Sequence, residues 1–263
     1  MNFFETIIYS LQKEMETPTP FGWFHLLWIF LTVIIIIILY KLKNKYNEKQ
    51  LKIVLGIYGI IALILEILKQ IIWSFNYENN IITWDYQWYA APFQLCTTPI
   101  YVSIICLFLK DNKIRKALLS YLAYITILGG FITILIPESC FVKTIEINIH
   151  TMWLHCGSFV ISIYLLMNEI KPIKQNLKYS IFVFLIFIFI AQILNIGIYN
   201  MNVLNGETFN MFYISPYFES TLPVFEIIYQ NVPYIIFLLI YILVISLGAV
   251  LIYSLSKLLK TQK

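Results

Sequence analysis

Apolar residues gather in seven long stretches of the chain, and polar segments separate them. Each stretch is close to the roughly 20 residues that a helix needs to cross the hydrocarbon core of a bilayer. The stretches cover about residues 22–40, 53–74, 90–109, 117–136, 149–167, 179–199 and 233–254. This pattern predicts an all-α fold, a polytopic membrane helix bundle with seven transmembrane helices. The helices form a single seven-helix transmembrane domain over residues 1–263.

Basic residues follow every second apolar stretch. The segments after the first, third and fifth stretches, together with the C-terminal tail, hold 15 of the 18 lysine and arginine residues. Cytoplasmic loops of membrane proteins carry such an excess of positive charge. The distribution therefore predicts that the N-terminus lies outside and that the C-terminus is cytoplasmic, which agrees with an odd number of crossings.

The composition indicates a multi-pass protein of the cell membrane. Hydrophobic residues make up 60% of the chain and charged residues only 12%, about half the roughly 25% of soluble domains. The net charge of +4 follows from the basic loops, so it indicates no nucleic-acid partner. The four cysteines are scattered without a CxxC pair, which disfavours a disulfide framework. Abundant isoleucine, asparagine and lysine are typical of an AT-rich bacterial genome.

Polar side chains interrupt six of the seven stretches at one depth. In the predicted orientation they lie near the outer ends, whereas the inner halves are almost purely apolar. The layer comprises His25, Glu66, Lys69, Gln70, Gln94, Cys96, Thr97, Thr98, His150, His155, Gln192, Asn195, Asn231 and Tyr234. Because polar groups at membrane depth usually face protein or water rather than lipid, we expect a polar cavity that opens toward the outer leaflet.

The third stretch opens with a run of polar residues and prolines. Pro92 suits the first turn of a helix, where its missing N–H is not needed. Pro99 then falls inside the helix and kinks it, which would turn Gln94, Cys96 and either Thr97 or Thr98 toward the interior of the bundle. The alternative is a kinked packing helix whose threonine hydroxyls bond to backbone carbonyls.

Several polar residues also have a structural interpretation. Glu66 and Lys69 are three residues apart on one helix face, so they are expected to form an ion pair. His150 is expected to be an interfacial residue at a helix start, and Cys106 to be inert core. His25 either reaches the lipid headgroups or takes part in function.

A thiol and an imidazole at the same depth favour acyl transfer. A histidine can remove the proton of a neighbouring thiol and leave the nucleophilic thiolate. We predict Cys96 as the nucleophile and His155 as the base, with Gln94 or Asn195 as donors to the oxyanion. His150 and His155 are five residues apart, about 140° around a helix, which is poor geometry for chelation. We therefore predict no metal site and no cofactor.

Short motifs along the whole chain carry a resemblance to a family. The run Asn210-Met211-Phe212-Tyr213, followed by Ser215-Pro216, Pro223 and Val232-Pro233-Tyr234, resembles the asparagine, aromatic and proline pattern of YwaF-like integral membrane proteins. The run Pro92-Phe93-Gln94-Leu95-Cys96 resembles their proline, polar, leucine and cysteine stretch, and His25-Leu26 and the helix of His155 match as well. These bacterial proteins are similar to an animal multi-pass acyltransferase that remodels ether phospholipids through a cysteine and a histidine. The resemblance implies Cys96 as acyl carrier and His155 as base.

The function expected from these features is acyl transfer or hydrolysis on a phospholipid or lysophospholipid, through a Cys/His pair that faces the outer leaflet. The side chains predicted to bind the lipid are His25, Gln94, Thr97, Gln192, Asn195, Asn210 and Tyr213. The alternative is a carrier of a small molecule, ion or lipid that uses the polar layer as its binding site. Glu66, Lys69 and His155 would then relay protons, although the chain has no evident inverted repeat.

Overall fold

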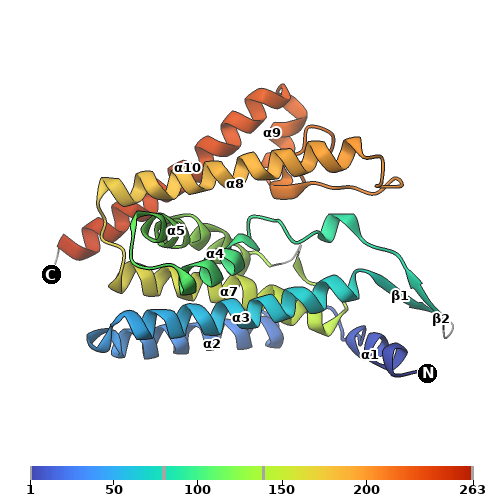
Figure 1. The fold of residues 1–263 in the computed structure, drawn as a ribbon, viewed down its shortest axis with the longest axis horizontal. Helices are drawn as coiled ribbons and strands as arrows, with labels where there is room; N and C mark the ends of the chain where they lie inside the picture. Colours follow the sequence, from blue (N-terminus) through green and yellow to red (C-terminus); the bar gives the residue numbers. More distant parts are fainter. Residues whose placement is uncertain (1, 79–80, 138–139, 262–263) are drawn as a thin grey trace.

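The computed structural model describes residues 2–78, 81–137 and 140–261. Long helices run along one direction and form an elongated bundle (Figure 1), which confirms the predicted all-α fold. The helices are α1 (Phe3–Leu11), α2 (Trp23–Lys41), α3 (Glu48–Ile72), α4 (Thr98–Phe108), α5 (Lys113–Tyr124), α6 (Thr126–Leu135), α7 (Ile145–Asn168), α8 (Lys174–Asn200), α9 (Phe225–Asn231) and α10 (Tyr234–Thr261). Between α3 and α4, strands β1 (Phe75–Glu78) and β2 (Ile81–Trp84) pair as an antiparallel hairpin.

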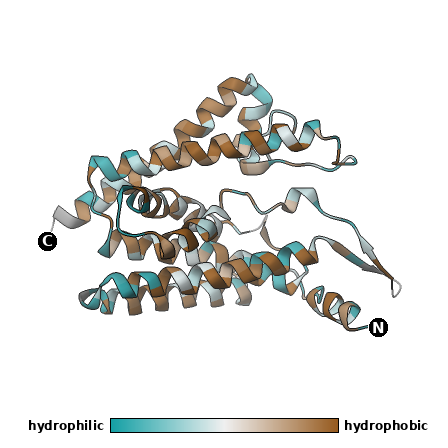
Figure 2. Cartoon of the chain, in the orientation of Figure 1, coloured by the Kyte–Doolittle hydropathy of each residue, from teal (hydrophilic) through white to brown (hydrophobic). Residues whose placement is uncertain are grey.

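Six helical segments in the described residues are long and apolar enough to cross a membrane. They are α2, α3, the joined α5 and α6, α7, α8 and α10. Apolar residues cover the outward surfaces of α8 and α10 (Figure 2), and Phe189 and Leu243 are 67% and 57% exposed. A soluble monomer rarely exposes so much continuous apolar surface. These surfaces are therefore the ones that face lipid.

The third apolar stretch folds differently from the prediction. Its helix, α4, has 11 residues and rises only about 16 Å, half of the roughly 30 Å hydrocarbon core. Turns replace the helix that was expected to begin at Pro92. Pro99 lies in the first turn of α4, where no N–H donor is needed. The predicted helix start at Pro92 and the predicted kink at Pro99 are therefore wrong.

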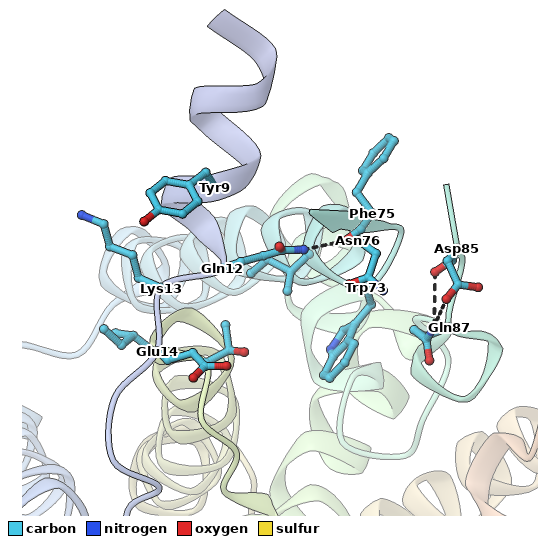
Figure 3. Close-up of a pocket in the computed structure, with 12 residues that line it drawn as sticks. Tyr9, Gln12, Lys13, Glu14, Trp73, Phe75, Asn76, Asp85 and Gln87 are labelled. Atoms are coloured by element: carbon cyan, nitrogen blue, oxygen red, sulfur yellow. Dashed lines mark hydrogen bonds between the residues drawn. The ribbon is translucent and has the colours of Figure 1, made fainter. Parts of the chain in front are cut away.

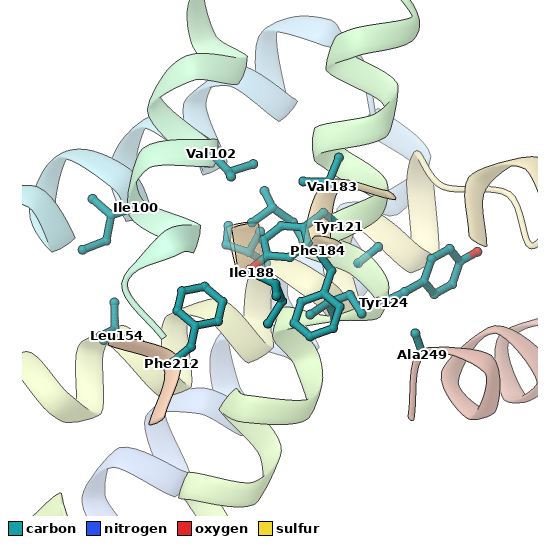
Figure 4. Close-up of a cluster of buried hydrophobic side chains, with 14 of the residues drawn as sticks. Ile100, Val102, Tyr121, Tyr124, Leu154, Val183, Phe184, Ile188, Phe212 and Ala249 are labelled. Carbon is teal, nitrogen blue, oxygen red and sulfur yellow. The ribbon is translucent and has the colours of Figure 1, made fainter. Parts of the chain in front are cut away.

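Helix α5 lies at the centre of the bundle. Five consecutive residues at its C-terminal end, 120–124, are buried, and a helix that is buried all round must be enclosed by neighbours. Tyr121, Phe184 and Phe212 come from three distant parts of the chain and pack in one cluster (Figure 4). Close approaches occur at glycines: a Cβ on Gly157 would lie 2.6 Å from the ring of Tyr58. These contacts fix α3, α5, α7 and α8 relative to one another.

The two ends of the bundle differ in content. Helix α1, the β-hairpin and residues 201–224 lie at one end, here called the hairpin end, and the basic connections 41–52 and 109–116 lie at the opposite end (Figure 1). The N-terminal segment is fastened to the start of α7 by backbone hydrogen bonds. The N–H of Met15 donates to Lys143 at 2.8 Å, and the N–H of Ile145 donates to Lys13 at 3.1 Å.

Candidate functional site

A charged cluster joins α3 to α7 in the half of the bundle nearest the hairpin end. Glu66 Oε2 lies 2.8 Å from His150 Nε2, and Glu66 Oε1 lies 2.8 Å from Lys69 Nζ. Glu66 is only 3% exposed, so its charge depends on these partners. The predicted ion pair of Glu66 and Lys69 is confirmed. The expectation that His150 is an interfacial residue is wrong, because it is buried and pairs with Glu66.

Gln70 connects the charged cluster to the segment that leads to Cys96. Its amide nitrogen donates to Glu66 at 2.9 Å and to the carbonyl of Ala90 at 2.8 Å. The hydroxyl of Tyr101 donates to the carbonyl of Pro92. These bonds hold the non-helical segment 90–97 against α3 and α4, so the irregular backbone has defined partners within the protein.

A cavity of about 380 Å³, here called the lateral cavity, borders the charged cluster. It runs along one side of α3 and is closed by the hairpin and by the start of the third stretch. Its lining residues are Leu63, Glu66, Ile67, Gln70, Ile71, Ser74, Phe75, Trp84, Pro92 and Tyr101. Ile67 and Trp84 are more than half exposed, so the cavity reaches the surface of the bundle. A mostly apolar cavity of this size fits a hydrocarbon chain better than a polar solute.

Four amide side chains form a second polar group, here called the amide cradle: Gln94, Gln192, Asn195 and Asn210. Asn195 accepts from the N–H of Met211 at 2.7 Å and donates to the carbonyl of the same residue at 3.0 Å. Gln94 accepts from the N–H of Phe212 at 2.8 Å and donates to the carbonyl of Asn210 at 3.0 Å. The cradle thus binds the backbone of one short segment, through Asn195 of α8 and through Gln94 of the non-helical segment that precedes α4.

The remaining two amides hold the next residues of that segment. Gln192 donates to the carbonyl of Ile214 at 2.8 Å. Asn210 accepts from the N–H of Ser215 at 2.8 Å and donates to the carbonyl of Glu219 at 2.9 Å. Because each of these amides already has backbone partners, the structure assigns them to holding the segment 210–219. Their predicted contact with a lipid stays a prediction.

The segment held by the cradle contains a strained turn. Phe212 and Tyr213 have φ angles of 59° and 58°, a left-handed conformation that residues other than glycine rarely adopt. Such strain persists only where surrounding contacts hold it, and it often marks functional sites. Burial raises the pKa of Tyr213, and the neighbouring Cys96 adds to this effect. Tyr213 therefore keeps its proton and can act as a hydrogen-bond donor.

Cys96 lies in the segment 90–97, which Gln70 ties to the charged cluster and Gln94 ties to the strained turn. It is partly buried, is not in a disulfide, and lies just before the N-terminus of α4. A nucleophilic role for this thiol requires a base that removes its proton. Thr97, the next residue, bonds with its hydroxyl to both the N–H and the carbonyl of Gln94 and so closes the turn that carries Cys96.

The other two histidines of the predicted layer have partners of their own. His155 interacts with His150 and with the carbonyl of Gly129, and no hydrogen bond joins it to Cys96 in the described structure. His25 is fully buried and accepts from the N–H of Phe21 at 2.9 Å, while its Nε2 faces the carbonyl of Ile134 at 2.9 Å. Both ring nitrogens of His25 thus connect the start of α2 to the end of α6.

Within residues 2–78, 81–137 and 140–261, no three His, Cys, Asp or Glu side chains gather as metal ligands. The structure connects the segment 90–97, which carries Cys96, to the charged cluster through Gln70 and to the segment of Tyr213 through Gln94. The sequence placed most of these residues at one depth. It did not indicate that His150 faces Glu66, although both residues belong to the predicted layer.

The sequence model of the TMEM164 family matches residues 20–253. No curated protein and no solved structure matches the chain. The match includes all candidate crossing helices from α2 to α8 and most of α10, and it leaves out α1. Together with the six apolar helices, it identifies a multi-pass membrane protein. The chain belongs to the TMEM164 family, a family of transmembrane proteins.

Proposed function

We propose that this protein transfers acyl groups to or from a phospholipid or lysophospholipid, with Cys96 as the acyl carrier. The observation that carries the proposal is the position of the Cys96 thiol. It belongs to the segment 90–97, which Gln70 ties to the buried charged cluster and Gln94 ties to the turn of Tyr213. Pro92 of the same segment lines the apolar lateral cavity. A nucleophile, a hydrogen-bond donor and a site for an acyl chain are the parts that acyl transfer needs.

In the proposed reaction the Cys96 thiolate attacks the ester carbonyl of a lipid donor. The bond from the carbonyl carbon to the glycerol oxygen breaks, a thioester forms, and the lysolipid leaves with the proton taken from the thiol. The hydroxyl of a lysolipid acceptor, or water, then attacks the thioester and releases the thiol. The hydroxyl of Tyr213 donates to the oxyanion of each tetrahedral intermediate.

Two histidines are candidates for the base in this proposal. His155 is the base that the sequence predicts. His150 belongs to the charged cluster, since it is paired with Glu66. His150→Gln and His155→Gln are compared, each alone and combined with Cys96→Ser. The true base acts as one unit with Cys96, so the activity of its double variant should be no lower than that of either single variant.

The proposal includes seven crossings, with the hairpin end outside and the basic end in the cytoplasm. Helix α4 completes the third crossing together with segment 90–97, whose backbone is buried within protein, as irregular backbone at membrane depth must be. The excess of basic residues on the opposite side supports this orientation. Labelling of single cysteines introduced into 42–47 from the outside would contradict it.

The second candidate is a carrier, and the charged cluster favours it. Buried ionisable groups inside a membrane domain often mark a proton or ion pathway. In a carrier, Glu66 would exchange a proton or ion while Cys96 stayed unmodified. Transport of labelled lipid or ions into proteoliposomes, measured beside acyl exchange on the same preparation, separates the candidates. Transport that is unchanged in Cys96→Ser, without acyl exchange in the parent protein, would favour the carrier.

The test of the acyltransferase uses lysophospholipid labelled on its headgroup and purified protein in bilayers. The proposal predicts labelled diacyl lipid in the presence of the parent protein and none above background with Cys96→Ser. Cys106→Ser is the matched control, because Cys106 is buried in the apolar core and should leave activity nearly intact.

A further inference from the structure

A second cavity lies at the hairpin end, between α1, the β-hairpin and the start of α7. Its volume is about 770 Å³, and it is here called the hairpin chamber. The residues that line it are Tyr9, Gln12, Lys13, Glu14, Ile72, Trp73, Phe75, Asn76, Asp85, Gln87, Thr144 and Ile145. Figure 3 shows Tyr9, Lys13 and Glu14 on one side of this space, and Asp85 and Gln87 on the opposite side.

The charges of the chamber are mixed. Its lining includes one lysine, Lys13, and two carboxylates, Glu14 and Asp85, together with the rings of Tyr9 and Trp73. An ammonium group is recognised by carboxylates and by aromatic faces, and a phosphate by lysine. The lining therefore carries one more negative charge than positive charges, which disfavours a ligand that has an anionic group but no cationic group. The lining thus suits a zwitterion with a phosphate and an ammonium group.

The chamber adjoins the apolar lateral cavity. Phe75 lines both spaces, and consecutive residues of α3 divide between them, with Ile71 in the lateral cavity and Ile72 in the chamber. A polar space therefore meets an apolar one along the same helix. This arrangement matches an amphiphile, whose headgroup would occupy the chamber while its hydrocarbon chain lies in the lateral cavity.

Helix α1 and the β-hairpin, which contribute to the chamber, also expose apolar side chains. Phe3 and Phe4 on α1 are 83% and 49% exposed, and Ile81 and Trp84 on the hairpin are 62% and 68% exposed. Exposed aromatic and aliphatic side chains beside charged ones are typical of segments that lie in the headgroup region of a bilayer. These exposed side chains favour a lipid over a free solute as the source of the zwitterion.

We infer that the hairpin chamber binds the headgroup of a zwitterionic phospholipid or lysophospholipid. Lys13 contacts the phosphate, and Asp85 contacts the ammonium group above the ring of Trp73. The site goes beyond the proposed acyl transfer, because lipid binding in the chamber does not require an acyl group on Cys96. Lys13 and Glu14 lie before the residues that the family model matches. The family match therefore does not include this wall of the site.

The experiment measures lipid binding with the full-length Cys96→Ser chain in detergent, so that loss of acyl transfer cannot affect the result. The probes are lysophosphatidylethanolamine, the anionic lysophosphatidylglycerol and soluble glycerophosphoethanolamine, with binding followed by native mass spectrometry. We expect the zwitterionic lysolipid to bind about tenfold more tightly than the anionic one, and Asp85→Asn to remove this preference. Lys13→Gln should weaken both lysolipids about tenfold.

Matched controls change charges of the same kind at the same end of the molecule. Lys143→Gln and Glu16→Gln alter exposed residues that do not line the chamber, and both should bind as the parent chain does. Equal binding of the two lysolipids, or equal loss in variants and controls, would overturn the headgroup site. Binding of glycerophosphoethanolamine as tight as that of the lysolipid would overturn the inference that the site takes an amphiphile.

Discussion

The charged cluster and the amide cradle occupy the same half of the bundle, yet their polar atoms have different partners. Glu66 meets Lys69, His150 and Gln70, all of them side chains. The cradle amides mostly meet backbone N–H and carbonyl groups of the segment 210–219. Neutral amides that bond to backbone groups hold a conformation, whereas a buried carboxylate that pairs with the side chains of a lysine and a histidine can change its partners.

The contrast shows how to interpret a polar layer in a membrane protein. Depth alone does not distinguish a site from a scaffold, because both groups avoid lipid. The difference lies in what adjoins each group. The charged cluster borders the lateral cavity, whereas the cradle supports the strained turn that contains Tyr213. Cys96 lies in the segment 90–97, which Gln70 ties to the cluster and Gln94 ties to the turn.

The largest expected effect is that of Cys96→Ser on acyl transfer. A hydroxyl is far less readily deprotonated than a thiol, so activity should fall by about 10³-fold or more. The measurement is the initial rate of labelled diacyl lipid formation at equal protein amounts. Unchanged activity would move the search for the nucleophile to Thr98 or Cys156.

Glu66→Gln tests the charged cluster. It leaves Lys69 and His150 without their buried carboxylate, and breaking a buried ion pair in this way costs about 3–5 kcal/mol. We expect a clear loss of thermal stability, measured by tryptophan fluorescence during heating. Glu16→Gln, at an exposed carboxylate, is the control and should change little. A parent-like melting curve for Glu66→Gln would show that the cluster does not stabilise the bundle.

Asn195→Ala tests the amide cradle. It removes two hydrogen bonds to Met211 and leaves buried backbone groups unpaired, at a cost of about 2–3 kcal/mol. Hydrogen exchange should become faster in residues 210–215, and activity should fall because Tyr213 is no longer held. Asn200→Ala on the same helix removes only an exposed bond to Ile196 and should leave exchange unchanged. Equal exchange in the two variants would contradict the role of the cradle.

The smallest effect is expected for Tyr213→Phe, which removes one hydroxyl without altering the turn. Loss of a single oxyanion donor should lower kcat by about 10–100-fold with little change in thermal stability. Tyr217→Phe is the control, because the exposed ring of Tyr217 stacks on Tyr199 with centroids 3.7 Å apart. If both variants retain full activity, Tyr213 is not the donor.

The sequence predicted the long helices well and their rotation poorly. The i,i+3 spacing was enough to predict the pair of Glu66 and Lys69, and the apolar stretches were enough to locate six long helices. That His150 faces Glu66 depends on how α3 and α7 turn toward each other, which the packing of Tyr58 on Gly157 sets. Such a contact between distant residues has no signature in a single sequence.

The short α4 was missed for a related reason. An apolar run that contains two prolines is compatible with a kinked helix or with turns followed by a shorter helix. The choice depends on partners outside the turns, since the side chains of Gln70 and Tyr101 donate to the backbone carbonyls of Ala90 and Pro92. The amide side chains of the cradle were predicted to bind substrate, because the sequence does not reveal that they already bond to backbone groups.

The central claim is that Cys96 carries an acyl group during turnover, and detection of that group tests it most directly. The protein would be incubated in bilayers that contain a phospholipid with a labelled acyl chain, then digested and analysed by mass spectrometry with and without neutral hydroxylamine. We predict a hydroxylamine-sensitive acyl thioester on the peptide that contains Cys96, present in the parent and in Cys106→Ser and absent in Cys96→Ser. Acyl exchange at the parent rate by Cys96→Ser, or turnover with the acyl group on another residue, would contradict the account.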